Sequence, residues 1–169
     1  QISATTEALL FMASRSQVVS DEIDPALDRG VVVLMDRFFL STYAYQIDGR
    51  GLPEDQIRSA NALAASGLVP DLTIVIQFPA AEGMSRAGTR GSPDRMERSG
   101  DAFHGRVERA FDRFTSGDWQ SAHRECGPIV AVDGRGSVDE VHARLIEALA
   151  THLPDPFVRL TTHGDSHQC

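Results

Sequence analysis

The sequence has 169 residues, enough for one domain with a sizeable core. Its net charge of −8 at pH 7 argues against a general nucleic-acid-binding protein, which would need a basic face. No apolar stretch is long enough to span a membrane, the start lacks the features of a signal peptide, and the two cysteines, Cys126 and Cys169, are isolated. We therefore expect a protein of the reducing cytoplasm.

The first half of the chain predicts a helix, a buried strand and a second helix. Residues 5–29 carry apolar residues on one face, and Gly30 is a plausible stop. Residues 31–35 form an unbroken, largely β-branched apolar run, typical of a strand buried on both faces of a parallel sheet. Ser41 or Thr42 is predicted to cap the helix that follows.

The second half alternates strands and helices. Helices are predicted over residues 53–66, 80–86 and 101–114, with a last helix that begins at Ser137 or Val138. Strands are predicted over residues 71–76 and 129–132, and residues 86–100 read as a mobile segment rich in Arg and Gly. This alternation favours an α/β fold with a parallel sheet, in one domain over residues 1–153 followed by a flexible tail over residues 154–169.

Polar residues cluster where the predicted strand 31–35 ends. Ligands of parallel sheets bind beyond the carboxyl ends of the strands, so Asp36 and Arg37 would stand at a binding edge. A carboxylate suits a metal ion and a guanidinium suits a phosphate, while Tyr45 and Gln46 offer an aromatic and an amide group to a base. The combination indicates nucleotide phosphoryl transfer.

Five short segments then appear in order: FMASRSQ at residues 11–17, DRF at 36–38, STYAYQ at 41–46, PDLT at 70–73 and DRME at 94–97. Together they resemble bacterial thymidylate kinase (dTMP kinase), and the resemblance extends from about residue 5 to about residue 149. It implies a P-loop-kinase-like three-layer sandwich with a parallel sheet. It also implies transfer of a phosphoryl group from ATP to dTMP with Mg²⁺, as a step of dTTP biosynthesis.

The resemblance implies a pocket for dTMP. Phe11 would stack on thymine and Arg15 would donate a hydrogen bond to a thymine carbonyl, although core packing and a solvated surface position are the plain alternatives. Arg37 would grip the dTMP phosphate, and Asp36 would lie near the magnesium, unless the two merely form a structural ion pair. Three further residues match family positions that contact the base and the sugar: Thr42, Tyr45 and Gln46. Each could equally cap a helix or pack in the core.

The resemblance also implies a lid that closes over ATP. Its arginines would stabilise charge on the transferring phosphoryl group, and its closure would exclude water, although a disordered charged loop is the alternative. Glu97 resembles the lid acid near the metal, and Asp133 resembles part of the loop that flanks adenine. Lid and ATP-binding candidates are Arg86, Arg90, Asp94, Arg95, Glu97 and Asp133, and the predicted catalytic set is Asp36, Arg37, Arg90 and Arg95.

One expected part is missing, because all 16 basic residues are Arg and a P-loop ends in Lys followed by Ser or Thr. A shortened sequence, a natural non-catalytic relative and a partner chain that supplies the loop are the three explanations, of which we favour the first. We expect little kinase activity from these residues alone. A non-catalytic nucleotide-binding or dimerisation module and a deoxynucleoside kinase are the alternative functions. The family resemblance also leads us to expect a homodimer formed through the helix over residues 5–29.

Overall fold

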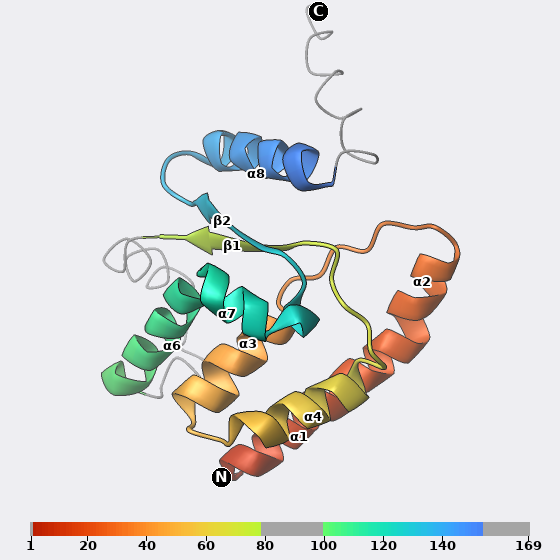
Figure 1. Ribbon diagram of the computed structural model, residues 1–169, viewed down its shortest axis with the longest axis vertical. Helices are drawn as coiled ribbons and strands as arrows, with labels where there is room; N and C mark the ends of the chain where they lie inside the picture. The colour runs from red at the N-terminus through yellow and green to blue at the C-terminus, as the bar shows by residue number, and fades with distance from the viewer. Residues whose placement is uncertain (1, 79–99, 154–169) are drawn as a thin grey trace, which may run out of the picture. The chain divides into compact units, whose positions relative to one another are not determined.

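The computed structural model describes residues 2–78 and 100–153, which fall into two compact units (Figure 1). Unit 1 comprises residues 2–69 and 100–116, and unit 2 comprises residues 70–78 and 117–153. Both units lie inside the predicted domain over residues 1–153. The predicted helix over residues 80–86, the Arg- and Gly-rich segment up to residue 99 and the predicted tail lie outside the described residues.

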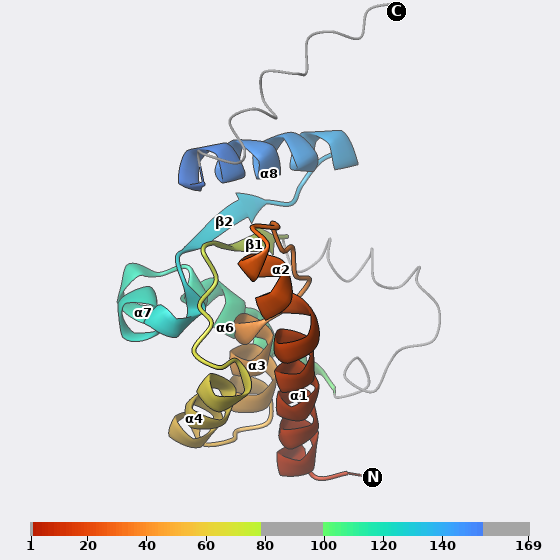
Figure 2. The ribbon, with the colours of Figure 1, turned by 90° about the vertical axis from the view of Figure 1, so that its right-hand side faces the viewer.

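Unit 1 begins with a long helical run, which confirms the helix predicted over residues 5–29. The run consists of α1 (Ala4–Val18), a π-helical turn η1 (Val19–Ile23) and α2 (Asp24–Asp28), and it is seen along its length in Figure 2. The hydroxyl of Ser3 caps α1 by accepting a hydrogen bond from the backbone N–H of Thr6 at 3.1 Å. Gly30 ends the run with φ +71°, a conformation that favours glycine.

Two more helices enclose the core of unit 1. Helix α4 (Glu54–Ala64) packs against α1 and buries Ile57, Asn61 and Ala64, which lie one or two turns apart (Figure 1). Helix α6 (Asp101–Phe114) packs against η2 (Tyr43–Gly49), the π-helical continuation of the short helix α3 (Phe39–Thr42). The ring centroids of Tyr43 and Phe114 lie 6.4 Å apart in this contact. Both α4 and α6 confirm predicted helices.

The buried strand predicted over residues 31–35 is wrong. These residues have no regular secondary structure, and their side chains are largely exposed, Leu34 by 93%. A parallel strand needs a neighbouring strand for its backbone hydrogen bonds, and no described strand pairs with this segment. The predicted cap at Ser41 or Thr42 is also wrong, because α3 begins at Phe39 and contains both residues.

Unit 2 contains the parallel sheet. Strand β1 (Thr73–Gln77) pairs in parallel with β2 (Ile129–Asp133), and Gln77 lies opposite Asp133 at the carboxyl ends. Both strands were predicted, and their parallel pairing confirms the α/β class, although β1 is only partly buried. Two short elements were not predicted: α7 (Gly117–Ala122) and the 3₁₀ turn η4 (Arg124–Cys126).

The last helix of unit 2 is α8 (Val138–His152), which packs on β2. Ser137 and Glu140 form a capping box at its start: the Ser137 hydroxyl accepts from the Glu140 N–H, and the Glu140 carboxylate accepts from the Ser137 N–H at 2.7 Å. This confirms the predicted helix start. The loop between β2 and α8 therefore has both of its ends fixed, by a strand and by a cap.

Candidate functional site

A cavity of about 170 Å³ opens in unit 1 between α1 and the loop that precedes α3. Phe11 lies on its wall and is 47% exposed, so the ring is not part of the core and can receive a flat ligand. Two guanidinium groups line the same cavity and give it a positive charge. The lining residues are Phe11, Ser14, Arg15, Val18, Met35, Arg37 and Phe38. The structure thus brings together the predicted residues Phe11, Arg15 and Arg37.

Arg15 is held from several sides. Its Nη2 donates to the carbonyl oxygen of Phe38 at 2.9 Å and to the hydroxyl oxygen of Thr42 at 3.0 Å. Its Nη1 donates to Oδ1 of Asn61 and lies 3.6 Å from the sulfur of Met12. Burial lowers the pKa of Arg15 to about 10, so the side chain is still charged at neutral pH. Four of its five N–H groups are therefore engaged, and Nε–H has no acceptor among the described residues.

Arg37 is exposed, in contrast to the half-buried Arg15. Its φ of +64° places a non-glycine residue in the left-handed region, which costs of order 1–3 kcal/mol. Its guanidinium lies 5.3 Å from the ring centroid of Tyr45 and makes no hydrogen bond within residues 2–78 and 100–153. Asp36 is also exposed, and no ion pair joins it to Arg37 in the described part of the chain. Strained backbone beside a cavity is often a mark of a functional position.

The remaining predicted acceptor residues lie outside the cavity wall. Thr42 is buried and reaches the site only through Arg15. Tyr45 is half-buried between Arg37 and Phe103, whose ring centroid is 6.1 Å away. Gln46 is buried and donates to Glu7 at 3.4 Å. Thr42 and Tyr45 thus each contact one of the two cavity arginines, whereas Gln46 contacts neither.

Asn61 was missed by sequence reasoning. It is 1% exposed on the buried face of α4, and its Oδ1 accepts from Arg15. The signal in the sequence was a polar residue four positions after Ile57 and three before Ala64, on the apolar face of a predicted helix. A buried polar side chain on such a face needs a partner, and here the partner is the guanidinium of the cavity.

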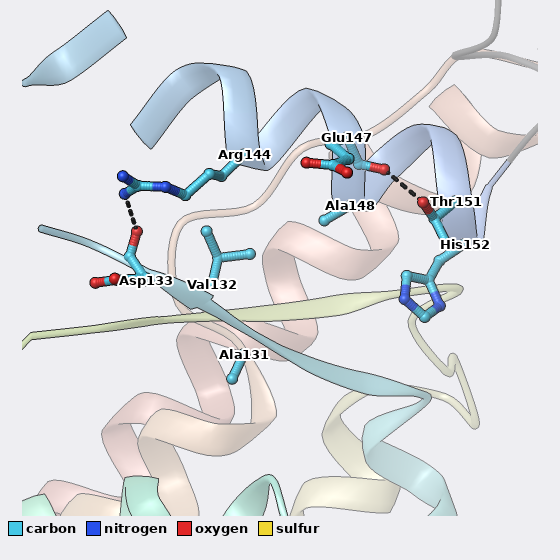
Figure 3. A pocket seen from close by; sticks show the side chains of 8 residues that line it. All are labelled: Ala131, Val132, Asp133, Arg144, Glu147, Ala148, Thr151 and His152. Atoms are coloured by element: carbon cyan, nitrogen blue, oxygen red, sulfur yellow. Dashed lines mark hydrogen bonds between the residues drawn. The ribbon is translucent and has the colours of Figure 1, made fainter. Parts of the chain in front are cut away.

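Asp133 lies in unit 2, at the carboxyl end of β2 (Figure 3). Its carboxylate accepts hydrogen bonds from Arg135, the shortest at 2.7 Å, and these bonds hold the pKa of Asp133 well below its usual range. Arg144 donates to the carbonyl oxygen of Asp133 at 2.8 Å and, like Asp133, lines a cavity of about 280 Å³ between β2 and α8. The carboxylate of Asp133 is thus hydrogen-bonded to Arg135, while its carbonyl oxygen links the end of β2 to α8 through Arg144.

Residues 1–144 match the thymidylate kinase family. The chain belongs to this family. The thymidylate kinase of Lactobacillus delbrueckii subsp. bulgaricus is 39% identical over 159 residues, which cover 93% of this chain and 72% of that protein. The thymidylate kinase of Rhizorhabdus wittichii is 39% identical over 154 residues, covering 90% of this chain and 71% of that protein. That of Hahella chejuensis is 37% identical over 152 residues, with coverages of 90% and 70%.

Membership in the thymidylate kinase family confirms the predicted P-loop kinase fold and the class of nucleoside monophosphate kinases. The predicted lid residues, from Arg86 to Glu97, lie outside the described residues. Within residues 2–78 and 100–153, no three His, Cys, Asp or Glu side chains gather where they would hold a metal ion. No helix in the described part of the chain is both long and apolar enough to cross a bilayer.

Proposed function

We propose that this protein transfers the γ-phosphoryl group of ATP to dTMP, giving dTDP and ADP, and that the cavity in unit 1 holds the dTMP. One observation carries the proposal: an exposed aromatic ring and two arginines from separate segments line the same cavity. A flat base and an anionic phosphate are the two parts of a nucleotide monophosphate that such a cavity recognises.

The base occupies the end formed by α1. Phe11 stacks on thymine, and Arg15 donates its remaining Nε–H to a thymine carbonyl. The hydroxyl of Thr42 accepts a hydrogen bond from Arg15 and helps to orient its guanidinium. Tyr45 packs beside the sugar and supports Arg37, while Gln46 fixes the turn that carries Tyr45 through its bond to Glu7.

The phosphate occupies the end formed by the loop before α3. Arg37 binds it with two parallel donors, since the exposed guanidinium lies against Tyr45 and makes no hydrogen bond to the described residues. A phosphate oxygen of dTMP forms a bond to the γ-phosphorus of ATP as the bond from that phosphorus to the ADP oxygen breaks. Asp36 suits Mg²⁺, which keeps several waters and needs only one or two carboxylates beside the phosphates. When bound, the ion neutralises charge on the phosphates.

The donor side is assigned to the lid and to the loop after β2. Arg86, Arg90 and Arg95 supply positive charge to the transferring group, with Asp94 and Glu97 near the nucleotide and the metal. Asp133 fixes the loop beside adenine through its bonds with Arg135. The 169 residues contain no lysine to grip the phosphates, so we predict little kinase activity from these residues alone.

We further propose a cytoplasmic homodimer that pairs through α1. Several apolar side chains of α1 are exposed on the part of the helix that does not face the core, including Leu9 and Leu10 at 58% each. A second copy of the helix would cover them. Sedimentation analysis of the Leu10→Glu variant tests this pairing, since a charge at a dimer seam shifts the protein to monomer and a distribution like that of the parent protein contradicts it.

The activity is tested with protein expressed from its whole reading frame. Separate assays contain ATP and one candidate acceptor: dTMP, dUMP or thymidine. We expect phosphate transfer to dTMP in preference to dUMP and no transfer to thymidine. Transfer to thymidine but not to dTMP would identify a deoxynucleoside kinase. Binding of dTMP without any transfer would identify a non-catalytic nucleotide-binding module.

A further inference from the structure

Asn61 stands out among the buried polar side chains of unit 1. It is 1% exposed, its Oδ1 accepts from Nη1 of Arg15, and its Nδ2 has no hydrogen-bond partner among the described residues. The orientation of the amide follows from this contact, because Arg15 only donates and so faces the oxygen. The NH₂ group is thereby turned to the side where the described residues offer no acceptor.

An unpartnered buried amide N–H is unfavourable, by about 1–3 kcal/mol. A leucine at this position of α4, between Ile57 and Ala64, would fill a similar volume without that cost. Stability of the helix packing therefore does not account for an asparagine here. The property that distinguishes it from leucine is the oxygen that receives the hydrogen bond from Arg15.

The contact completes a clamp on the guanidinium. The carbonyl of Phe38 and the hydroxyl of Thr42 hold Nη2 from the side of α3. Asn61 holds Nη1 from the side of α4. Because a guanidinium is planar, fixing both terminal nitrogens fixes the direction of Nε–H. Without Asn61, Nη1 keeps only its weak contact with the Met12 sulfur at 3.6 Å, so the direction of Nε–H is held less firmly.

We propose that Asn61 is a positioning residue for base recognition: it orients Arg15 so that Nε–H points to a carbonyl oxygen of the bound base. The proposal rests on the proposed function, since it takes the cavity beside Phe11 as the site of thymine. Asn61 itself does not line that cavity, so it acts through Arg15 and not by contact with the nucleotide. Its effect is therefore on discrimination between bases more than on overall affinity for nucleotides.

The test compares dissociation constants, measured by calorimetry on the whole protein, for dTMP and for two dTMP analogues. In each analogue one of the two thymine carbonyl oxygens is replaced by hydrogen. Asn61→Leu is expected to weaken dTMP binding about tenfold and to leave binding of one analogue within twofold of the parent protein. Asn61→Asp, which keeps an oxygen at the same place, is expected to restore dTMP binding to within about threefold. Asn61→Ala replaces the leucine variant if that variant does not fold.

Ile57→Ala is the matched control, because it removes a buried side chain one turn away on the same face of α4 without touching Arg15. It is expected to lower the melting temperature while keeping the ratio of dTMP to analogue affinities. The double variant Asn61→Leu with Arg15→Met is expected to bind dTMP no more weakly than Arg15→Met alone, because Asn61 acts through Arg15.

Unchanged dTMP binding in Asn61→Leu would overturn the proposal, as would equal weakening for dTMP and both analogues. A parent protein that does not bind dTMP would instead overturn the proposed function, and this proposal with it. The two failures are distinguished by whether the parent protein or only the variant departs from expectation.

Discussion

The two arginines of the cavity show how one ligand site combines a fixed end with an open one. Arg15 is half-buried and donates four of its N–H groups to neighbouring atoms of the protein. Arg37 is exposed, has no hydrogen bond within the described residues and sits on strained backbone at φ +64°. The fixed arginine has its orientation before any ligand arrives, whereas the open one keeps its donors for an anion.

The difference follows from what each end has to recognise. A base carbonyl is a neutral acceptor at one fixed place in the site. A donor group that is already oriented loses little conformational freedom when it binds that carbonyl. A phosphate carries charge and several oxygens, so an exposed guanidinium can engage it in more than one geometry. Substitutions at the two positions should therefore have opposite effects on stability and similar effects on binding.

The largest effect is expected from Arg15→Met. The substitution leaves the carbonyl of Phe38 and the oxygens of Thr42 and Asn61 without their donor, and each buried group that loses its partner costs about 1–3 kcal/mol. We expect the free energy of unfolding to fall by about 3 kcal/mol, measured by urea denaturation, and dTMP affinity to fall at least tenfold, since a charge-assisted hydrogen bond is worth about 1.5–3 kcal/mol.

Arg58→Ala is the control for this loss. Arg58 pairs with Glu54 at 3.8 Å on the exposed face of α4, and such surface pairs contribute at most about 1 kcal/mol. A similar loss of stability in both variants would show that Arg15 is not held as the structure has it.

Arg37→Gly should act in the opposite direction on stability. Glycine adopts φ +64° without strain, so we expect the free energy of unfolding to rise by about 0.5–1 kcal/mol. Affinity for dTMP should fall tenfold or more as the phosphate loses its charged partner. Ser66→Gly is the matched control, because Ser66 also has a positive φ, of 52°, and does not line the cavity. It should show the gain in stability with unchanged binding; loss of binding in both variants would refute the role of Arg37.

Sequence reasoning succeeded where the signal was local. The apolar spacing of α6, the helix start at Ser137 or Val138 and the β-branched runs of β1 and β2 are each local signals, and each prediction was confirmed. The partners of Arg15 were not predictable in this way. They lie 23 to 46 residues away along the chain, so the tertiary fold alone brings Phe38, Thr42 and Asn61 together.

The segment over residues 31–35 shows the opposite failure. Its composition is that of a buried strand, but composition does not supply the neighbouring strand that its backbone requires. The cap predicted at Ser41 or Thr42 failed for a related reason, because Phe39 and Leu40 are buried in the core and the helix already begins at Phe39. In both cases long-range packing decided the outcome.

A small effect is expected from Leu34→Ser, which measures how exposed this segment is in solution. Leu34 is 93% exposed, so the free energy of unfolding should change by less than about 0.5 kcal/mol. The comparison variant is Leu40→Ser, since Leu40 is 6% exposed and its replacement by serine should cost several times more. A loss of about 2 kcal/mol or more for Leu34→Ser would mean that the side chain is covered in solution, and the loop beside Arg37 would then be less open than we infer.

The smallest effect on stability is expected at Asp133 and Arg135, where an arginine makes several hydrogen bonds at the surface. Arg135 donates to Asp133 from both Nε and Nη2, at 3.0 and 2.7 Å, and so lowers the pKa of Asp133. A lowered carboxyl pKa stabilises the fold above the ordinary value of 3.8, and this contribution is lost as the pH falls from there through the folded-state pKa.

Arg135→Ala should return the pKa of Asp133 towards its ordinary value, measured by NMR titration of the carboxyl carbon, and should flatten the dependence of stability on pH below about pH 4. At neutral pH its cost should be far below that of Arg15→Met, because solvent screens the pair. If Arg135→Ala and Arg15→Met cost the same stability, the number of hydrogen bonds, and not burial, would distinguish Arg15 from Arg37. A small cost with a clear pKa change would establish burial as the reason that Arg15 holds its place.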